Sequence, residues 1–113
     1  MGGILKMIIA VSSDKESRTS DYENTYKIIF FETENSLIIS ETEFIPKTLD
    51  TDYISSEFKS RSVEVYICKG IKDTAKEIFI DTGIETVHDV NMSAKDSAIT
   101  YLCGKKLGIS EMR

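Results

Sequence analysis

The sequence predicts an α/β fold in which a mixed, five-stranded sheet is covered by helices on both faces, making three layers. Short apolar runs suited to buried strands alternate with segments whose apolar residues recur at helical spacing. Two of the strand-like runs are separated by only four polar residues, which indicates a hairpin. The length of 113 residues predicts a single domain, residues 1–113.

Three apolar runs predict strands that are buried on both faces, at residues 7–11, 63–67 and 84–90. The runs 25–32 and 37–44, around a polar connection at 33–36, predict the hairpin. Glutamates in the second hairpin strand are typical of a sheet edge that resists pairing with another chain. Because crossovers between parallel strands are right-handed, we expect the first and fourth strands to be central, with the hairpin on one flank and the fifth strand on the other.

Three helices are expected from the spacing of apolar residues: 50–61, 71–82, and a last helix that opens at Ser93. Residues 74–77 fit the capping-box pattern, with Thr74 as the cap. Gly83 is well placed to end the second helix. We expect residues 111–113 to be loose.

Composition and charge argue against several classes of function. The formal net charge is −5, and the densest basic pair is Lys105-Lys106, so the clustered cations of a nucleic-acid-binding surface are missing. No stretch approaches the roughly 20 apolar residues of a membrane span. Two cysteines, Cys68 and Cys103, fit a reducing compartment better than a disulfide framework. We therefore expect a cytoplasmic protein that binds neither nucleic acid nor membrane.

The best candidate site lies where the first and fourth strands end. Ligands of open α/β sheets bind outside the carboxyl ends of the strands, so Ser12, Ser13, Cys68, Lys69 and Gly70 are expected around one crevice. Backbone N–H groups at the start of the following helix would favour an anion, and Lys69 would add positive charge. A thiolate at Cys68 could ligate a soft metal or the iron of a cluster. Alternatively, Cys68 is a small buried hydrophobe and Gly70 serves only the turn.

Other candidate residues have a functional and a structural interpretation. His88, the only histidine, could ligate a metal or transfer protons, or it could be a polar residue of an edge strand. Cys103 is expected to be packed. Four carboxylates crowd the first long loop and could hold Mg²⁺ for a phosphoesterase, or could simply be solvated: Asp14, Glu16, Asp21 and Glu23. No catalytic triad or P-loop can be assembled, so we expect no enzyme.

Residues 63–87, VEVYICKGIKDTAKEIFIDTGIETV, and residues 93–107, SAKDSAITYLCGKKL, carry a family resemblance. They resemble the strand, Gly-rich turn, helix, strand and closing helix of the dinitrogenase iron–molybdenum cofactor biosynthesis family, the NifX and NifB C-terminal type of nitrogenase accessory domain. At the front, MIIAVSSD resembles the family's opening strand and TYKIIFFETENSLIISE its hairpin.

The resemblance implies a ribonuclease H-like topology and a non-catalytic accessory protein that carries an iron–sulfur or iron–molybdenum cluster. Its partner would be that cluster or a cofactor-assembly protein, and Cys68 would be the metal ligand. The family's histidine-containing motif before the hairpin is absent, because residues 20–25 read SDYENT. The chain would then be degenerate in cofactor binding. An alternative is a protein-interaction or regulatory module that kept the fold and lost the ligand.

Overall fold

The computed structural model describes residues 3–113 and, within that range, contains a six-stranded sheet and three α-helices. The predicted single domain spans residues 1–113, of which residues 1 and 2 lie outside the described range. The strands are β1 (Lys6–Ser13), β2 (Lys27–Glu34), β3 (Leu37–Phe44), β4 (Val65–Ile67), β5 (Glu85–His88) and β6 (Ile109–Glu111). The helices are α1 (Thr51–Ser60), α2 (Asp73–Asp81) and α3 (Ala94–Leu102), and a short 3₁₀ helix, η1 (Tyr22–Asn24), precedes β2.

The strand order across the sheet is β3-β2-β1-β4-β5-β6. β1 pairs with β2 in antiparallel fashion over its whole length and with β4 in parallel, and β4 pairs with β5 in parallel. The structure therefore confirms a mixed sheet with β1 and β4 at its centre, the hairpin on one flank and β5 on the other. β3 is an edge strand, as its glutamates indicate.

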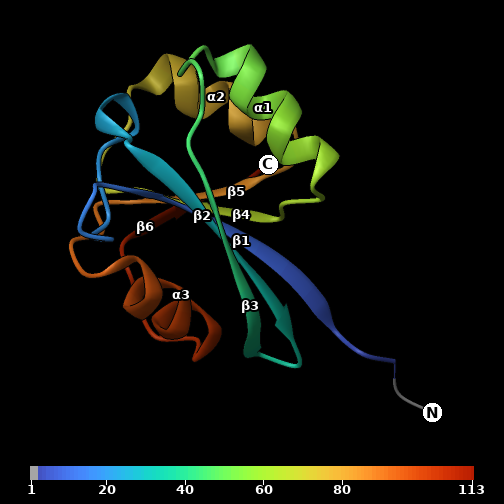
Figure 1. The fold of residues 1–113 in the computed structure, drawn as a ribbon. Coiled ribbons are helices and arrows are strands. Elements are labelled where there is room, and N and C mark those ends of the chain that lie inside the picture. Colours follow the sequence, from blue (N-terminus) through green and yellow to red (C-terminus); the bar gives the residue numbers. More distant parts are fainter. Residues whose placement is uncertain (1–2) are drawn as a thin grey trace.

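Helices cover both faces of this sheet. Figure 1 shows α1 and α2 together on one face and α3 on the opposite face. Side chains alternate along β1, so that Ala10 joins a core rich in aromatic residues beneath α1 and α2. Ile9 and Val11 join a largely aliphatic core, which also contains Phe31, beneath α3. Burial on both faces explains why the central strands read as continuous apolar runs. No helix among residues 3–113 has the length and apolarity needed to cross a bilayer.

The expectation of five strands, with residues 111–113 loose, was wrong. Residues Ile109–Glu111 form β6, which pairs in antiparallel fashion with β5. Gly108 permits this close approach, because a Cβ atom at that position would lie 2.2 Å from the His88 carbonyl oxygen. Arg113 forms ion pairs with Glu77 and Asp81 of α2, so the chain end is also held.

The hairpin connection is shorter than expected. Two residues, Asn35 and Ser36, link β2 to β3, and both have positive φ (52° and 68°), as the right-handed twist of a tight hairpin requires. The polar residues 33 and 34 extend β2 instead of joining the loop.

The helix termini agree only in part with expectation. Gly83 follows α2 with φ +90°, and Ser93 caps α3 by accepting a hydrogen bond from the Asp96 amide at 3.0 Å. The capping box at Thr74 was wrong, because α2 already begins at Asp73 with Lys72 as its N-cap and no side-chain cap.

Candidate functional site

The two serines at the end of β1 face opposite sides of the sheet. Both are fully buried. The Ser12 hydroxyl lies 2.6 Å from the Tyr66 hydroxyl and 2.9 Å from the hydroxyl of Thr25, beneath α1 and α2. The Ser13 hydroxyl donates to the Asp14 carbonyl at 2.7 Å. The structure thus brings Ser12 toward the end of β4 but places Ser13 on the α3 side.

Cys68 follows β4 directly, with no exposed surface. Its amide donates to the Val87 carbonyl at 2.9 Å, which fixes the residue against β5. Burial raises the pKa of the Cys68 thiol to about 12, and a hydrogen bond with Tyr66 offsets only part of this effect. The thiol therefore keeps its proton at neutral pH, and a thiol in that state is a poor ligand for soft metals.

The turn at Lys69 and Gly70 is bonded to the long polar loop that precedes β2. The Lys69 amide donates to the Ser20 carbonyl at 2.8 Å, and the Tyr22 amide donates to the Gly70 carbonyl at 2.8 Å. A Cβ atom on Gly70 would lie 2.7 Å from a carboxylate oxygen of Asp21. A side chain at this position would therefore have to displace the Asp21 carboxylate, which lies against the turn where an anionic ligand was expected.

Tyr22, in the loop that is bonded to this turn, is buried in the same core cluster as Cys68. Its side chain is 3% exposed, and its ring packs edge-on against Phe79 and Tyr66, with centroids 5.5 and 6.3 Å away. Its hydroxyl donates to the Leu49 carbonyl at 2.5 Å. The sequence reasoning missed this residue, although Tyr22 is the only aromatic residue in the polar stretch 12–24. An isolated aromatic residue in such a stretch is the signal that could have found it.

The start of α2 offers little to an anion. Lys72 and Asp73 are exposed, and the Asp73 carboxylate lies in the first turn, where it already complements the positive end of the helix. Lys76 pairs with Asp73 at 3.3 Å, so one nearby cation is also engaged.

His88 takes part in a network of polar contacts with the added strand β6, so it does not lie in an edge strand as expected. Its Nε2 lies 2.7 Å from a carboxylate oxygen of Glu111 in β6, and its Nδ1 lies 3.4 Å from Asp89. Lys76 of α2 also contacts Glu111 at 2.7 Å. Hydrogen bonds from Lys76 and then His88 lower the pKa of Glu111. The network joins β5, β6 and α2.

The remaining candidates are dispersed. Cys103 was expected to be packed, but it is exposed and free at the end of α3. In the first loop the Asp14 carboxylate accepts hydrogen bonds from the amides of Glu16 and Arg18, at 2.9 and 3.0 Å. Among residues 3–113, no group of three histidine, cysteine, aspartate or glutamate side chains is placed to hold a metal ion.

These residues do not fit an iron–sulfur or iron–molybdenum cluster at Cys68. Cluster iron is held by thiolates or imidazoles that can reach the cluster. Here the Cys68 thiol is buried and protonated, and the turn beside it is bonded to residues 20–22.

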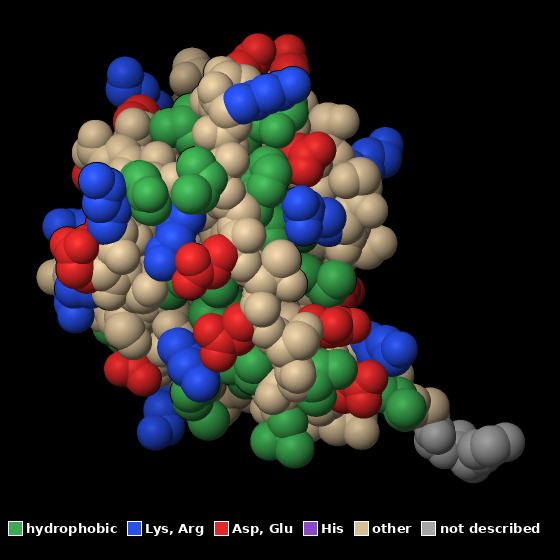
Figure 2. All heavy atoms as spheres, viewed as in Figure 1, with side chains coloured by type: hydrophobic (Ala, Val, Ile, Leu, Met, Phe, Trp, Pro, Cys, Tyr) green, Lys and Arg blue, Asp and Glu red, His purple; other side chains and the backbone are tan. Residues whose placement is uncertain are grey.

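The face shown in Figure 2 carries acidic and basic side chains interspersed rather than one extended charged patch.

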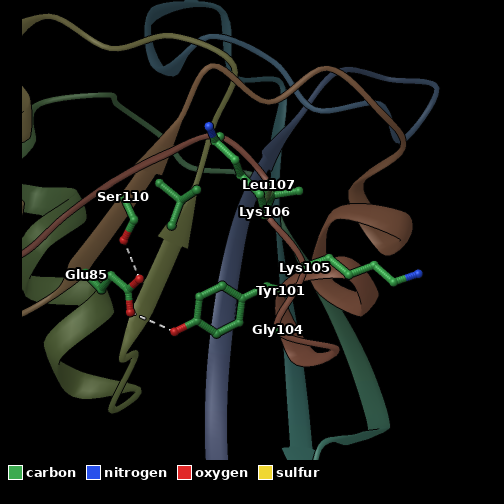
Figure 3. Close-up of a pocket in the computed structure, with 9 residues that line it drawn as sticks. Glu85, Tyr101, Gly104, Lys105, Lys106, Leu107 and Ser110 are labelled. Carbon is green, nitrogen blue, oxygen red and sulfur yellow. Dashed lines mark hydrogen bonds between the residues drawn. The ribbon is translucent and has the colours of Figure 1, made fainter.

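A pocket of about 460 Å³ lies away from this crevice, on the α3 side of the sheet. It is formed by β5, β6, the end of α3 and the loop 104–108 (Figure 3). No residue that the sequence reasoning selected as a site lines it.

No protein-family model and no curated protein matches this sequence. Its fold matches solved structures along nearly the whole chain. The structure of PH0822 has a TM-score of 0.79 at 18% identity, covering 89% of this chain and 96% of that one. A dinitrogenase-like protein, MJ0327 from Methanococcus jannaschii, has a TM-score of 0.75 at 20% identity, covering 96% and 99%. The apo form of the orange protein from Desulfovibrio gigas has a TM-score of 0.72 at 9% identity, covering 95% and 92%. This chain therefore has the fold of these dinitrogenase-like and orange proteins.

Proposed function

We propose that this chain is a non-catalytic accessory protein of the dinitrogenase cofactor-assembly type that no longer holds a cluster at Cys68. In this proposal it acts by contact with another protein of cofactor assembly. The likeness to the dinitrogenase-like protein and to the orange protein supports the accessory role. The strand order β3-β2-β1-β4-β5 supports the proposed ribonuclease H-like topology, with β6 as an addition. Two free cysteines fit a cytoplasmic location.

The observation that carries the proposal is the closure of the crevice beside Cys68. A cluster carrier needs ligands that reach solvent, because the cluster must enter and leave. Here the ligand that the resemblance implies is fully buried, its pKa is raised to about 12, and the turn that follows it is hydrogen-bonded to the backbone of Ser20 and Tyr22.

Anaerobic reconstitution tests the loss of cluster binding. The purified chain is mixed with iron, sulfide and thiomolybdate, and visible absorbance and bound metal are measured after desalting. Cys68→Ala and Cys103→Ala form a matched pair, because one cysteine is buried and the other exposed. We expect any bound metal to be unaffected by Cys68→Ala and reduced by Cys103→Ala. Stoichiometric absorbance that depends on Cys68 would overturn the proposed loss and support a carrier.

The partner is tested separately. Titration calorimetry with the purified cofactor-assembly proteins of the same organism should detect saturable binding by the cluster-free chain. Binding that requires a loaded cluster would contradict the proposal, as would the absence of binding to every one of these proteins.

A further inference from the structure

The two faces of the sheet differ in how much helix covers them. Among residues 3–113, α1 and α2 cover one face, whereas α3 alone covers the opposite face (Figure 1). A helix of nine residues, such as α3, is about 14 Å long. The hairpin strands β2 and β3 have eight residues each, which makes them about 27 Å long. The single helix is therefore too short to cover the hairpin along its whole length.

Two adjoining hollows lie between the hairpin and α3. They measure about 320 and 250 Å³, and Ser36 and Leu102 line both of them. Their apolar lining comes from the start of β1, from β3 and from α3, and includes Leu5, Met7, Leu37, Ile38, Ile99 and Leu102. We call these residues the α3–hairpin patch. Figure 2 shows apolar side chains reaching the surface at the lower edge of the molecule, where Figure 1 places the hairpin tip and α3.

The exposure of this patch indicates a contact surface. The side chains of Leu5, Leu37 and Ile99 are 76%, 69% and 42% exposed. Single exposed apolar residues are common on soluble proteins, but a contiguous group of them usually marks a site that another molecule covers. The same group supplies both protruding side chains and the hollows beside them. An isologous contact between two copies needs this combination, because one patch must both insert and receive.

Charges at the rim of the patch favour a second copy over a partner of one charge sign. Lys95 lies 3.2 Å from Glu41, and Lys6 lies 3.9 Å from Glu34. Glu64 also lines the second hollow. The rim thus carries lysines and glutamates side by side, so a second copy related by a two-fold axis can bring each sign against its opposite. This matters because the chain carries a net charge of −5, which makes its copies repel one another.

We propose that two copies of this chain associate through the α3–hairpin patch, with Leu37 of each copy entering the hollow beside Ile99 of the other. The lysines and glutamates at the rim then pair between the copies. This association does not rest on the proposed accessory function, because the patch lies on the α3 face and Cys68 lies in the core beneath α1 and α2. It is measured on the chain alone, so its failure leaves the accessory proposal standing.

Sedimentation velocity of the full chain, under reducing conditions and from micromolar to millimolar concentration, tests the association. The average mass should rise from one chain to two and stop there, because an isologous contact closes. Leu37→Asp should raise the dissociation constant at least about a hundredfold, because each dimer loses two buried leucines and buries two charges. Ile99→Asp should do the same from α3. Ile45→Asp is the matched control, because Ile45 is 61% exposed but lines neither hollow.

Two further measurements test the arrangement of the copies. Cys103 is exposed and lines the first hollow, so its reaction with DTNB should slow at concentrations where the dimer forms. Lys95→Glu should weaken the dimer, and Lys95→Glu combined with Glu41→Lys should restore it. Circular dichroism confirms that each variant is folded before its mass is measured.

Several results would overturn the proposal. A chain that keeps the mass of one copy throughout the concentration range does not associate. Equal weakening by Ile45→Asp and Leu37→Asp would place the contact elsewhere, and growth beyond two copies would exclude a closed dimer. If the chain stays single and Leu37→Asp weakens its binding to a cofactor-assembly protein, the patch serves that protein and not a second copy.

Discussion

Replacement of Tyr22 by alanine tests whether this side chain closes the crevice beside Cys68. The ring is 3% exposed and packs against Phe79 and Tyr66. Truncation of a buried aromatic residue to alanine lowers the free energy of unfolding by about 3–5 kcal/mol. For a chain of this size that loss lowers the Tm by more than about 10 °C. Chemical and thermal unfolding, followed by circular dichroism, measure both quantities.

The matched control is Tyr22→Phe, which keeps the ring and removes only the hydroxyl that donates to the Leu49 carbonyl. Loss of that one hydrogen bond should cost about 1 kcal/mol, with a larger cost if the carbonyl is left unsatisfied. Both variants are made in a Cys103→Ala background, so that Cys68 is the only thiol. A thiol-specific reagent such as DTNB should modify Cys68 much faster in the alanine variant than in the phenylalanine variant.

Two results would refute this reasoning. If Tyr22→Ala lowers the free energy of unfolding by no more than Tyr22→Phe does, the ring does not pack as described. If Cys68 with the intact tyrosine reacts as fast as the thiol of the unfolded chain, the crevice is open and the argument against a cluster at Cys68 fails.

Three other predictions concern β6 and the first loop. Gly108→Ala should lower the free energy of unfolding by about 1–3 kcal/mol, because the added Cβ would overlap the His88 carbonyl oxygen. Hydrogen exchange should show that the β6 amides lose protection. Unchanged protection would contradict the described pairing. Hydrogen bonds from Lys76 and His88 lower the pKa of Glu111 in the folded chain, so its stabilising contribution is present above its ordinary pKa and is lost as the pH falls through the lowered value. Urea unfolding at descending pH should therefore show a weaker acid dependence for Glu111→Gln than for the unaltered chain, and equal slopes would count against the network. Asp14→Ala should lower the free energy of unfolding by about 1 kcal/mol, because the carboxylate's hydrogen bonds to two amides are lost. Neither this variant nor the unaltered chain should cleave a model phosphodiester with Mg²⁺. Cleavage that depends on Asp14 would make the chain an enzyme.

The elements that could be predicted from the sequence are those with a local signal. The buried runs became β1, β4 and β5, and helical spacing located all three helices within a few residues. β6 could not be predicted, because three residues carry no periodicity and its strand geometry comes from pairing with β5 and from Glu111 meeting Lys76. The start of α2 was misjudged because a capping-box pattern at Thr74 is only a local preference, and the helix begins before it.

The candidate site, like the secondary structure, could be predicted only in the features that do not depend on contacts between residues far apart in the sequence. Its position at the ends of β1 and β4 follows from topology, and the structure does bring Ser12 and Cys68 to Tyr66. The closure depends on hydrogen bonds between residues far apart in the sequence, such as Tyr22 to Gly70. A polar loop gives no indication of which distant backbone groups it will bond, so these hydrogen bonds could not be predicted. The burial of Cys68 was one of the two interpretations that the sequence allowed, and the structure confirms it.

The central position of β1 also has a consequence for the order of folding. Its antiparallel partner β2 follows within a short stretch of sequence, whereas its parallel partner β4 is more than 50 residues away in the chain. Closing a short loop costs less entropy than closing a long one. The three-stranded meander β1-β2-β3 can therefore assemble while the rest of the chain is being synthesised. Until β4 is synthesised and pairs with β1, the other edge of β1 remains unpaired. The nascent chain is most prone to aggregate during this interval.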